Sequence, residues 1–269
     1  WAQVTEGQID SAHSSSLHSS DMVPARVDGA KATEQSWLRP STDRAPRFQV
    51  QHTSFGFRYA AIRRPIVNAN SHDYVRTTVF VAPFTSLIPP NNVHNVTTVL
   101  VPIDDINTNF YFIAWNNSEK PGVDQETWRK FNVAQMGIDL DENFRPKRTR
   151  DNNFLQDRQA MKLGNFTGIA GIPNQDIAMW ETMGRTGISD RTKERLGASD
   201  IAVVEFRRLM VDAARQMRDT GVALGRTTPH IPHAKISSFE GIVPKTIDWR
   251  TLGVAPEELA LREGSERVA

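Results

Sequence analysis

The 269-residue sequence contains no cysteine. Without thiols the chain forms no disulfide, which is typical of proteins from a reducing cytoplasm. No apolar run approaches the roughly 18 residues that a membrane-spanning helix needs, and no secretory signal sequence is recognisable. We therefore expect a cytoplasmic protein that makes no contact with a membrane.

Neither sign of charge is in excess, because 32 basic residues stand against 31 acidic ones. Proteins that bind nucleic acids normally concentrate basic residues on one surface. The even balance therefore argues against a nucleic-acid partner. The chain is long enough to bury a single hydrophobic core, so we expect one domain over residues 1–269.

The first half of the chain has the alternation of apolar and polar residues that predicts β-strands. The expected strands are residues 48–53, 55–62, 74–84, 93–102 and 109–115. Their connections are too short for helical crossovers, so the strands should form an antiparallel meander.

The second half has helical patterns. We expect a short helix around residues 126–130, a helix that starts at Pro173 and Asn174, and a long helix from Ser199 as its N-cap to Gly221 as its stop. Three segments are expected to be loops or polar connections, the last of them wrapping the surface: 21–46, 141–157 and 225–249. A sheet followed by long helices predicts an α+β fold, with helices packed on one face of an antiparallel sheet.

Two histidines and an aspartate near the start of the chain form a D-x-x-H-x-x-x-x-H pattern of Asp10, His13 and His18. At about 100° per residue the imidazoles would lie about 140° apart on an ideal helix, so both reach one ion only if the helix ends or bulges between them. The serines at 14–16 favour such a break, because their hydroxyls compete for backbone hydrogen bonds. Asp10 would project from the same side as His13 and accept its second N–H. The pattern predicts a metal site, with two structural histidines at a helix end as the alternative.

Two histidines leave a metal site incomplete. Asp176 is the best further ligand, because it follows an expected helix start and would face inward if Trp180 packs in the core. Asp190 and Asp200 are the alternatives. Both have an ordinary structural explanation, because Asp190 directly precedes Arg191 and Asp200 directly follows the expected N-cap serine. Two histidines and one carboxylate on one side of a metal, with open positions opposite, form the ligand set of non-haem ferrous oxygenases.

Three stretches carry a family resemblance: the histidine motif, Q-D-x-x-x-W at residues 175–180, and E-T-M-G-R-x-x-x-x-D-R-T-x-E-x-L-G-x-S-D at residues 181–200. Together they resemble the catalytic domain of the oxygenase component of Rieske non-haem iron aromatic ring-hydroxylating dioxygenases, over roughly residues 1–220. The flanking D-S-A-H-S-S-S-L-H-S-S-D-M-V-P-A and W-L-R-P-S runs are most similar to phthalate-oxidising members. The resemblance implies a helix-grip arrangement of sheet and helices.

The resemblance also implies a mechanism. One ferrous ion would be held by His13, His18 and Asp176, and Asp10 would link it to the Rieske cluster of a neighbouring subunit. That two-iron two-sulfur cluster needs two cysteines and two histidines, so this cysteine-free chain is expected to be the catalytic domain only, with the N-terminal Rieske domain absent. The implied reaction is cis-dihydroxylation of an aromatic ring by dioxygen, with NADH electrons delivered by a separate reductase component. The implied assembly is a homo-oligomer, a trimer or a hexamer.

The implied substrate is an aromatic dicarboxylate such as phthalate, whose two negative charges need fixed cations with fork geometry. The candidates are Arg39, which follows the histidine motif, and Arg76, at the start of a strand. Ser11 could donate a further hydrogen bond. Arg58 and Arg63 are the second choice. Two other functions stay open: an O-demethylating monooxygenase of a methoxybenzoate, which keeps the metal site, and a metal-free helix-grip module that binds an apolar ligand.

Overall fold

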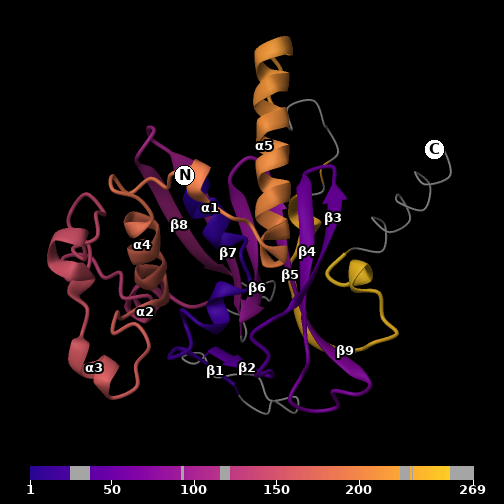
Figure 1. Ribbon diagram of the computed structural model, residues 1–269, viewed down its shortest axis with the longest axis horizontal. Coiled ribbons are helices and arrows are strands. Elements are labelled where there is room, and N and C mark those ends of the chain that lie inside the picture. Colours follow the sequence, from indigo (N-terminus) through magenta and orange to yellow (C-terminus); the bar gives the residue numbers. More distant parts are fainter. Residues whose placement is uncertain (25–36, 92–93, 116–121, 225–230, 232, 255–269) are drawn as a thin grey trace.

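The computed structural model describes residues 1–24, 37–91, 94–115, 122–224, 231 and 233–254. Its centre is a seven-stranded antiparallel sheet (Figure 1). Six strands are adjacent in chain order and a seventh, β9, pairs with β5: β3 (Arg47–Thr53), β4 (Gly56–Arg63), β5 (His72–Val81), β6 (Thr85–Asn91), β7 (His94–Pro102), β8 (Thr108–Trp115) and β9 (Phe239–Pro244). The predicted antiparallel meander is confirmed.

The sequence prediction missed strand β6, because its two prolines were interpreted as a boundary between strands. Proline cannot donate to a regular ladder and is confined to strand edges and bulges. The register between β6 and β7 shifts between Ile88 and Asn91, so Pro89 and Pro90 fall in this irregular stretch of the pairing.

The segment from 225 to 249 was expected to wrap the surface, and this is wrong for β9. Strand β5 pairs with β6 only from Val79 to Val81, which leaves the first part of β5 with an open edge. β9 covers that edge, with Phe239 opposite Thr77 and Pro244 opposite His72. An unpaired edge exposes backbone donors and acceptors, so a distant segment that completes the ladder stabilises the sheet.

The helices are α1 (Ala2–Gln8), α2 (Gln125–Phe131), α3 (Arg158–Lys162), α4 (Ile172–Thr182) and α5 (Ile201–Thr220). Short 3₁₀ turns lie at His13–Ser15, Arg150–Leu155, Arg191–Lys193, Ala198–Asp200, His233–Lys235 and Trp249–Thr251. The predicted stop of the long helix at Gly221 is confirmed by its left-handed φ of 69°, whereas the N-cap is Asp200 and not Ser199. No helix among the described residues is long and apolar enough to cross a membrane.

In three places the observed elements differ from the predicted loops and helix boundaries. The segment 21–46 contains β1 (Met22–Pro24) and β2 (Trp37–Arg39), which form a short parallel pair. The polar connection up to Asp157 is followed directly by α3, which the sequence analysis did not predict. Helix α4 begins at Ile172, one residue before the expected Pro173, so Asp176 is its fifth residue and lies just beyond the first turn.

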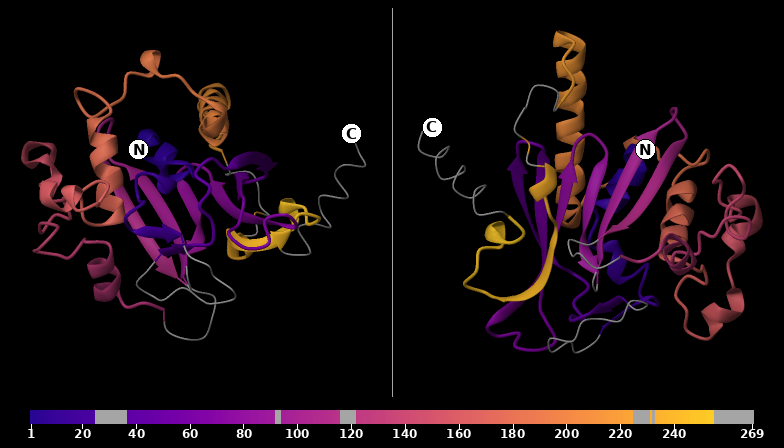
Figure 2. Two further views of the ribbon diagram at one scale, coloured as in Figure 1. Left: turned by 60° about the horizontal axis from the view of Figure 1, so that its bottom comes forward. Right: turned by 180° about the vertical axis from the view of Figure 1, so that it is seen from behind.

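Helices α1 and α5 pack on one side of the sheet, with α4 beside them (Figure 2, left). Phe206 of α5 meets Phe80 of β5 edge to face, with ring centroids 5.2 Å apart. Trp180 of α4 is buried, as predicted, and packs edge-on against Phe110 of β8. The α+β class is confirmed, while the helix-grip arrangement stays a prediction. This packing places the histidine motif between the sheet and α4.

Candidate metal centre

The α-helix at the start of the chain ends before either histidine. Helix α1 ends at Gln8, and Asp10 then forms an Asx turn, in which its carboxylate accepts the N–H groups of Ala12 at 2.7 Å and His13 at 3.3 Å. An Asp side chain that bonds to the following backbone competes with helical hydrogen bonds. The α-helix therefore ends before His13, and the 3₁₀ turn that His13 begins ends at Ser15, so the predicted break between the two histidines is present.

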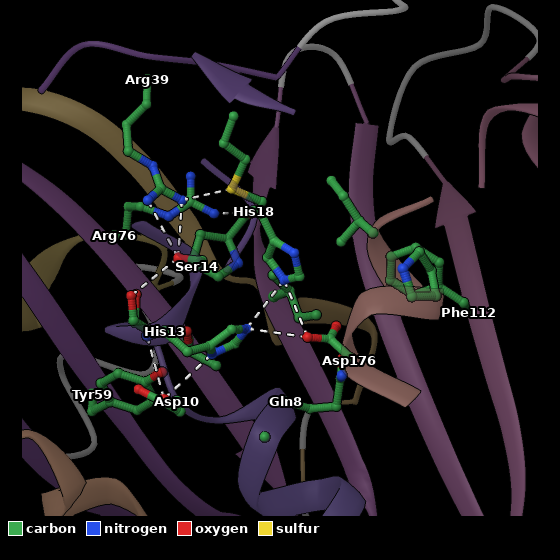
Figure 3. A pocket seen from close by; sticks show the side chains of 18 of the residues that line it. Gln8, Asp10, His13, Ser14, His18, Arg39, Tyr59, Arg76, Phe112 and Asp176 are labelled. Atoms are coloured by element: carbon green, nitrogen blue, oxygen red, sulfur yellow. Dashed lines mark hydrogen bonds and ion pairs between the residues drawn. The ribbon is translucent and has the colours of Figure 1, made fainter. Parts of the chain in front are cut away.

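The structure brings His13, His18 and Asp176 together at one point (Figure 3). The two Nε2 atoms of the histidines lie 3.2 Å apart, and the Oδ1 atom of Asp176 lies 3.4 Å from His13 Nε2 and 3.2 Å from His18 Nε2. An ion about 2.0–2.2 Å from nitrogen and oxygen donors fits a triangle of this size. In the described part of the chain, this is the one set of three such side chains with ligand atoms within 4.8 Å of one another.

Electrostatics also favour a cation between these atoms. Burial lowers the pKa of His13, but hydrogen bonds and charges from Asp10 and Asp176 outweigh it and raise the pKa to about 10. Burial raises the pKa of Asp176, yet its contacts with the two histidines bring it below the usual value. In the metal-free protein a proton on His13 therefore balances the carboxylates, and a metal ion would replace it.

Both histidines have partners on the ring edge that faces away from the triangle. Asp10 Oδ2 lies 3.3 Å from His13 Nδ1, so the predicted contact is present. Gln175 Oε1 lies 2.7 Å from His18 Nδ1, a contact that sequence reasoning missed. Its only sequence signal was the position of Gln175 directly before Asp176 in the family-like stretch.

The two rival carboxylates have structural roles. Asp190 accepts the N–H of Thr192 at the start of a 3₁₀ turn. Asp200 accepts the N–H of Gly197 just before α5. Neither belongs to the set of ligand atoms at the candidate centre.

The donor triangle faces a pocket between the sheet, the N-terminal segment and α4 (Figure 3). Asp10 and Ser11 line it beside the candidate ligands. Much of its wall is apolar and comes from β6, β8 and α4: Ile88, Pro89, Phe110, Phe112, Ile172 and Pro173. Gln8 and Tyr59, neither of them predicted, also line it.

Both predicted substrate arginines line this pocket, but in different electrostatic settings. Arg76 is ion-paired with Glu240 of β9, with Nη1 2.8 Å from Oε2. Arg39 donates to the hydroxyls of Ser14 and Ser15 at 3.1–3.3 Å and to the Met22 sulfur, all of which are neutral. Burial and then the charge of Arg76 lower the pKa of Arg39. Tyr74 and Glu240 act in the opposite direction, and an anion beside Arg39 would offset the lowering of its pKa further.

The second-choice arginines do not line the pocket. Arg63 donates to the Ser11 carbonyl at 2.6 Å, and its Nε and Nη1 atoms are buried without a partner. Arg58 donates to the carbonyls of Arg250 and Leu252 and lies over the Trp249 ring. Arg58 therefore ties the C-terminal turn to β4, and Arg63 supports the backbone next to Asp10.

Two histidines and a carboxylate that face a partly apolar pocket match the donor set of facial-triad mononuclear metal sites. A family model described as "LigXa C-terminal domain like" matches residues 1–268, and the chain belongs to this family.

Two curated relatives extend this result. The chain is 63% identical over 250 residues to the phthalate 4,5-dioxygenase oxygenase subunit of Pseudomonas putida, an alignment that covers 93% of this chain and 56% of the relative. It is 29% identical over 269 residues to the 3-chlorobenzoate-3,4-dioxygenase oxygenase subunit of Comamonas testosteroni, covering 93% of this chain and 59% of the relative. The predicted resemblance is confirmed. The chain spans a little over half the length of the curated relatives it matches.

Proposed function

We propose that the chain is the catalytic domain of the oxygenase component of an aromatic ring-hydroxylating dioxygenase, with ferrous iron held by His13, His18 and Asp176. The observation that carries this proposal is the donor triangle at a buried pocket, with edges of 3.2, 3.2 and 3.4 Å. Both relatives are named as oxygenase subunits of dioxygenases, which supports the same class of reaction here. When bound, the iron supplies the position at which dioxygen is bound and reduced.

The protein side chains would supply geometry and a dry environment. The apolar wall of the pocket excludes water and packs against an aromatic ring, while Asp10 and Gln175 hold the two imidazoles from behind. The proposed overall reaction adds both atoms of dioxygen to adjacent ring carbons and consumes one NADH and one proton, giving a cis-dihydrodiol and NAD⁺. The electrons would come from a reductase component through a Rieske cluster held outside this cysteine-free chain.

The pocket charge supports an aromatic dicarboxylate such as phthalate as the substrate. Three buried arginines, Arg39, Arg63 and Arg76, surround the pocket or the backbone at Ser11, and among the described residues only Arg76 has an ion-pair partner, Glu240. Of these three, Arg39 both lines the pocket and has no ion-pair partner among the described residues, so a substrate carboxylate beside it would offset its charge. We propose that Arg39 binds one carboxylate, with Arg76 and Ser11 beside it.

Metal analysis of a ligand variant tests the proposed centre. The parent protein should hold one iron per chain, and His13→Ala should lose most of it, because a two-donor site binds divalent metals weakly. His52→Ala is a matched control, since His52 is an exposed histidine on β3 whose side chain is 72% accessible. Full iron retention in His13→Ala would refute the assignment.

Product analysis tests the reaction. In an enzyme that also carries the Rieske cluster, supplied with NADH, the reductase component and ¹⁸O-labelled dioxygen, phthalate should give a dihydrodiol in which both added oxygen atoms are labelled. Formaldehyde released from a methoxybenzoate, without dihydrodiol from phthalate, would instead support the O-demethylase. A protein that binds no metal and still binds apolar ligands would support a metal-free binding module.

A further inference from the structure

The side chain of Gln175 contacts His18 in the interior of the protein. The exposed fraction is 1% for Gln175 and 2% for His18. Gln175 Oε1 lies 2.7 Å from His18 Nδ1, on the ring edge opposite the donor triangle. The other end of the Gln175 amide, Nε2, donates to the Asp21 carboxylate at 2.8 Å and to the Ile169 carbonyl at 2.9 Å.

These contacts determine the orientation of the amide. A carboxylate and a backbone carbonyl only accept hydrogen bonds, so the end of Gln175 that faces them must be the NH₂ group. The end that faces His18 is then the oxygen, which also only accepts. His18 Nδ1 must therefore carry a hydrogen, and in the neutral imidazole the lone pair is left on Nε2. That lone pair faces Asp176 Oδ1 and His13 Nε2, both 3.2 Å away.

From this chain of contacts we infer that Gln175 is a positioning residue, which holds His18 as the Nδ1–H tautomer with Nε2 directed at the metal ion. The inference rests on the proposed metal centre and extends it to a residue that is not a ligand. Gln175 and Asp176 are consecutive residues of α4, so this one helix supplies a metal ligand and orients another. Asp21 completes the ring of contacts, because its backbone N–H donates to the His18 carbonyl at 2.9 Å.

The two histidines are consequently supported by different chemistry. His13 is backed by a carboxylate, and His18 is backed by a neutral amide that is itself held by a carboxylate. The neutral acceptor orients the second imidazole without placing another negative charge against it. Loss of such an outer contact typically lowers metal affinity by about 10–100-fold.

Titration of the metal-free protein with Co²⁺, followed by its visible absorption, tests the inference. Gln175→Met keeps the length of the side chain and removes the strong acceptor, so it should weaken Co²⁺ binding by about 10–100-fold and alter the absorption bands. Asn174→Leu is the matched control. Asn174 is a buried amide on the same helix that donates to the carbonyls of Val133 and Ala170 and contacts no ligand. This control should bind Co²⁺ with the parent affinity.

A double variant keeps the test decisive if Gln175→Met does not fold. Gln175→Glu combined with Asp21→Asn conserves net charge, retains an acceptor toward His18 and reverses the bond to residue 21. If Gln175→Met folds, the double variant should bind Co²⁺ at least tenfold more tightly than Gln175→Met does. If Gln175→Met does not fold, the double variant should bind Co²⁺ within tenfold of the parent affinity. The role of Gln175 would be overturned if Gln175→Met kept the parent affinity and the parent spectrum. It would also be overturned if the double variant bound Co²⁺ more weakly than these limits. A parent protein that binds no Co²⁺ would overturn the metal centre as well.

Discussion

Asp10 contacts His13 on the ring edge that faces away from the other two donors, and its side chain is 26% accessible to solvent. It is therefore placed to connect the candidate centre with groups outside the chain without serving as a ligand. Asp10→Asn keeps the size of the side chain and an acceptor oxygen, so it should retain most of the iron while turnover falls by about 10–100-fold or more. The measurements are the iron content and the rate of NADH-dependent product formation in an enzyme that also carries the Rieske cluster. Undiminished turnover would exclude Asp10 from electron delivery.

Arg39 is the pocket cation whose described partners are all neutral. If it binds a substrate carboxylate, Arg39→Met should weaken phthalate binding by about 2–5 kcal/mol, because the carboxylate loses a buried charged partner. Calorimetric titration with phthalate is the measurement, and iron content should stay at the parent value. Arg208→Met on the exposed side of α5, where the side chain is 72% accessible, is the control. Parent affinity in Arg39→Met would refute the proposed carboxylate site.

The packing of α1 against α4 depends on a glycine. A methyl group on Gly7 would come within 2.8 Å of Cε2 in the Trp180 ring, so no side chain fits at this position while Trp180 keeps its place. These helices flank the candidate centre, because the histidine motif follows α1 and Asp176 belongs to α4. Close helix approach is therefore one of the constraints that bring the three donors together.

Gly7→Ala should lower the free energy of unfolding by about 1–3 kcal/mol, the usual cost of overpacking, and should weaken metal binding. Denaturant unfolding and Co²⁺ titration measure the two effects. Gly197→Ala is the control, since its nearest contact would be Asp200 Oδ2 at 3.7 Å and its backbone is not left-handed. Equal stability and equal metal affinity in both variants would show that the α1–α4 distance has no such role.

Strand β9 shows how one element changes the interpretation of a residue in another. Arg76 was predicted to bind a substrate carboxylate because it lies on a strand near the metal motif. The pairing of β9 with β5 places Glu240 directly opposite Arg76, and the two side chains form an ion pair. Part of the charge of Arg76 is therefore already balanced by the protein, which makes Arg39 the stronger candidate for the substrate.

On the scale of the whole molecule, α5 extends beyond the sheet (Figure 1), and its residues 214–220 are all exposed. The family resemblance implies that electrons pass between neighbouring subunits, so each active site would need a second copy of the protein. We expect a closed homo-oligomer, a trimer or a hexamer. Sedimentation velocity should detect this assembly for the active enzyme. A monomer with full activity would contradict it.

The sequence by itself determined the features that depend on neighbouring residues. The strand alternation predicted the meander. Gly221 predicted the end of α5, because glycine adopts the left-handed backbone conformation that often ends a helix. Asp10 was expected to contact His13, three residues later. Each of these depends on backbone propensity or on contacts within one turn, and such information is local.

The tertiary structure decided which distant residues meet. Gln175 supports His18, and Glu240 pairs with Arg76, although each pair is separated by more than 150 residues. The meeting of Asp176 with His18 was expected from the family resemblance and an expected helix start, and the structure gives its distance of 3.2 Å. Residue spacing says nothing about such contacts, because they depend on how α4 packs beside the sheet and on which strand covers the open edge of β5. Burial of apolar surface and completion of the backbone ladder select that arrangement, and both are properties of the whole chain.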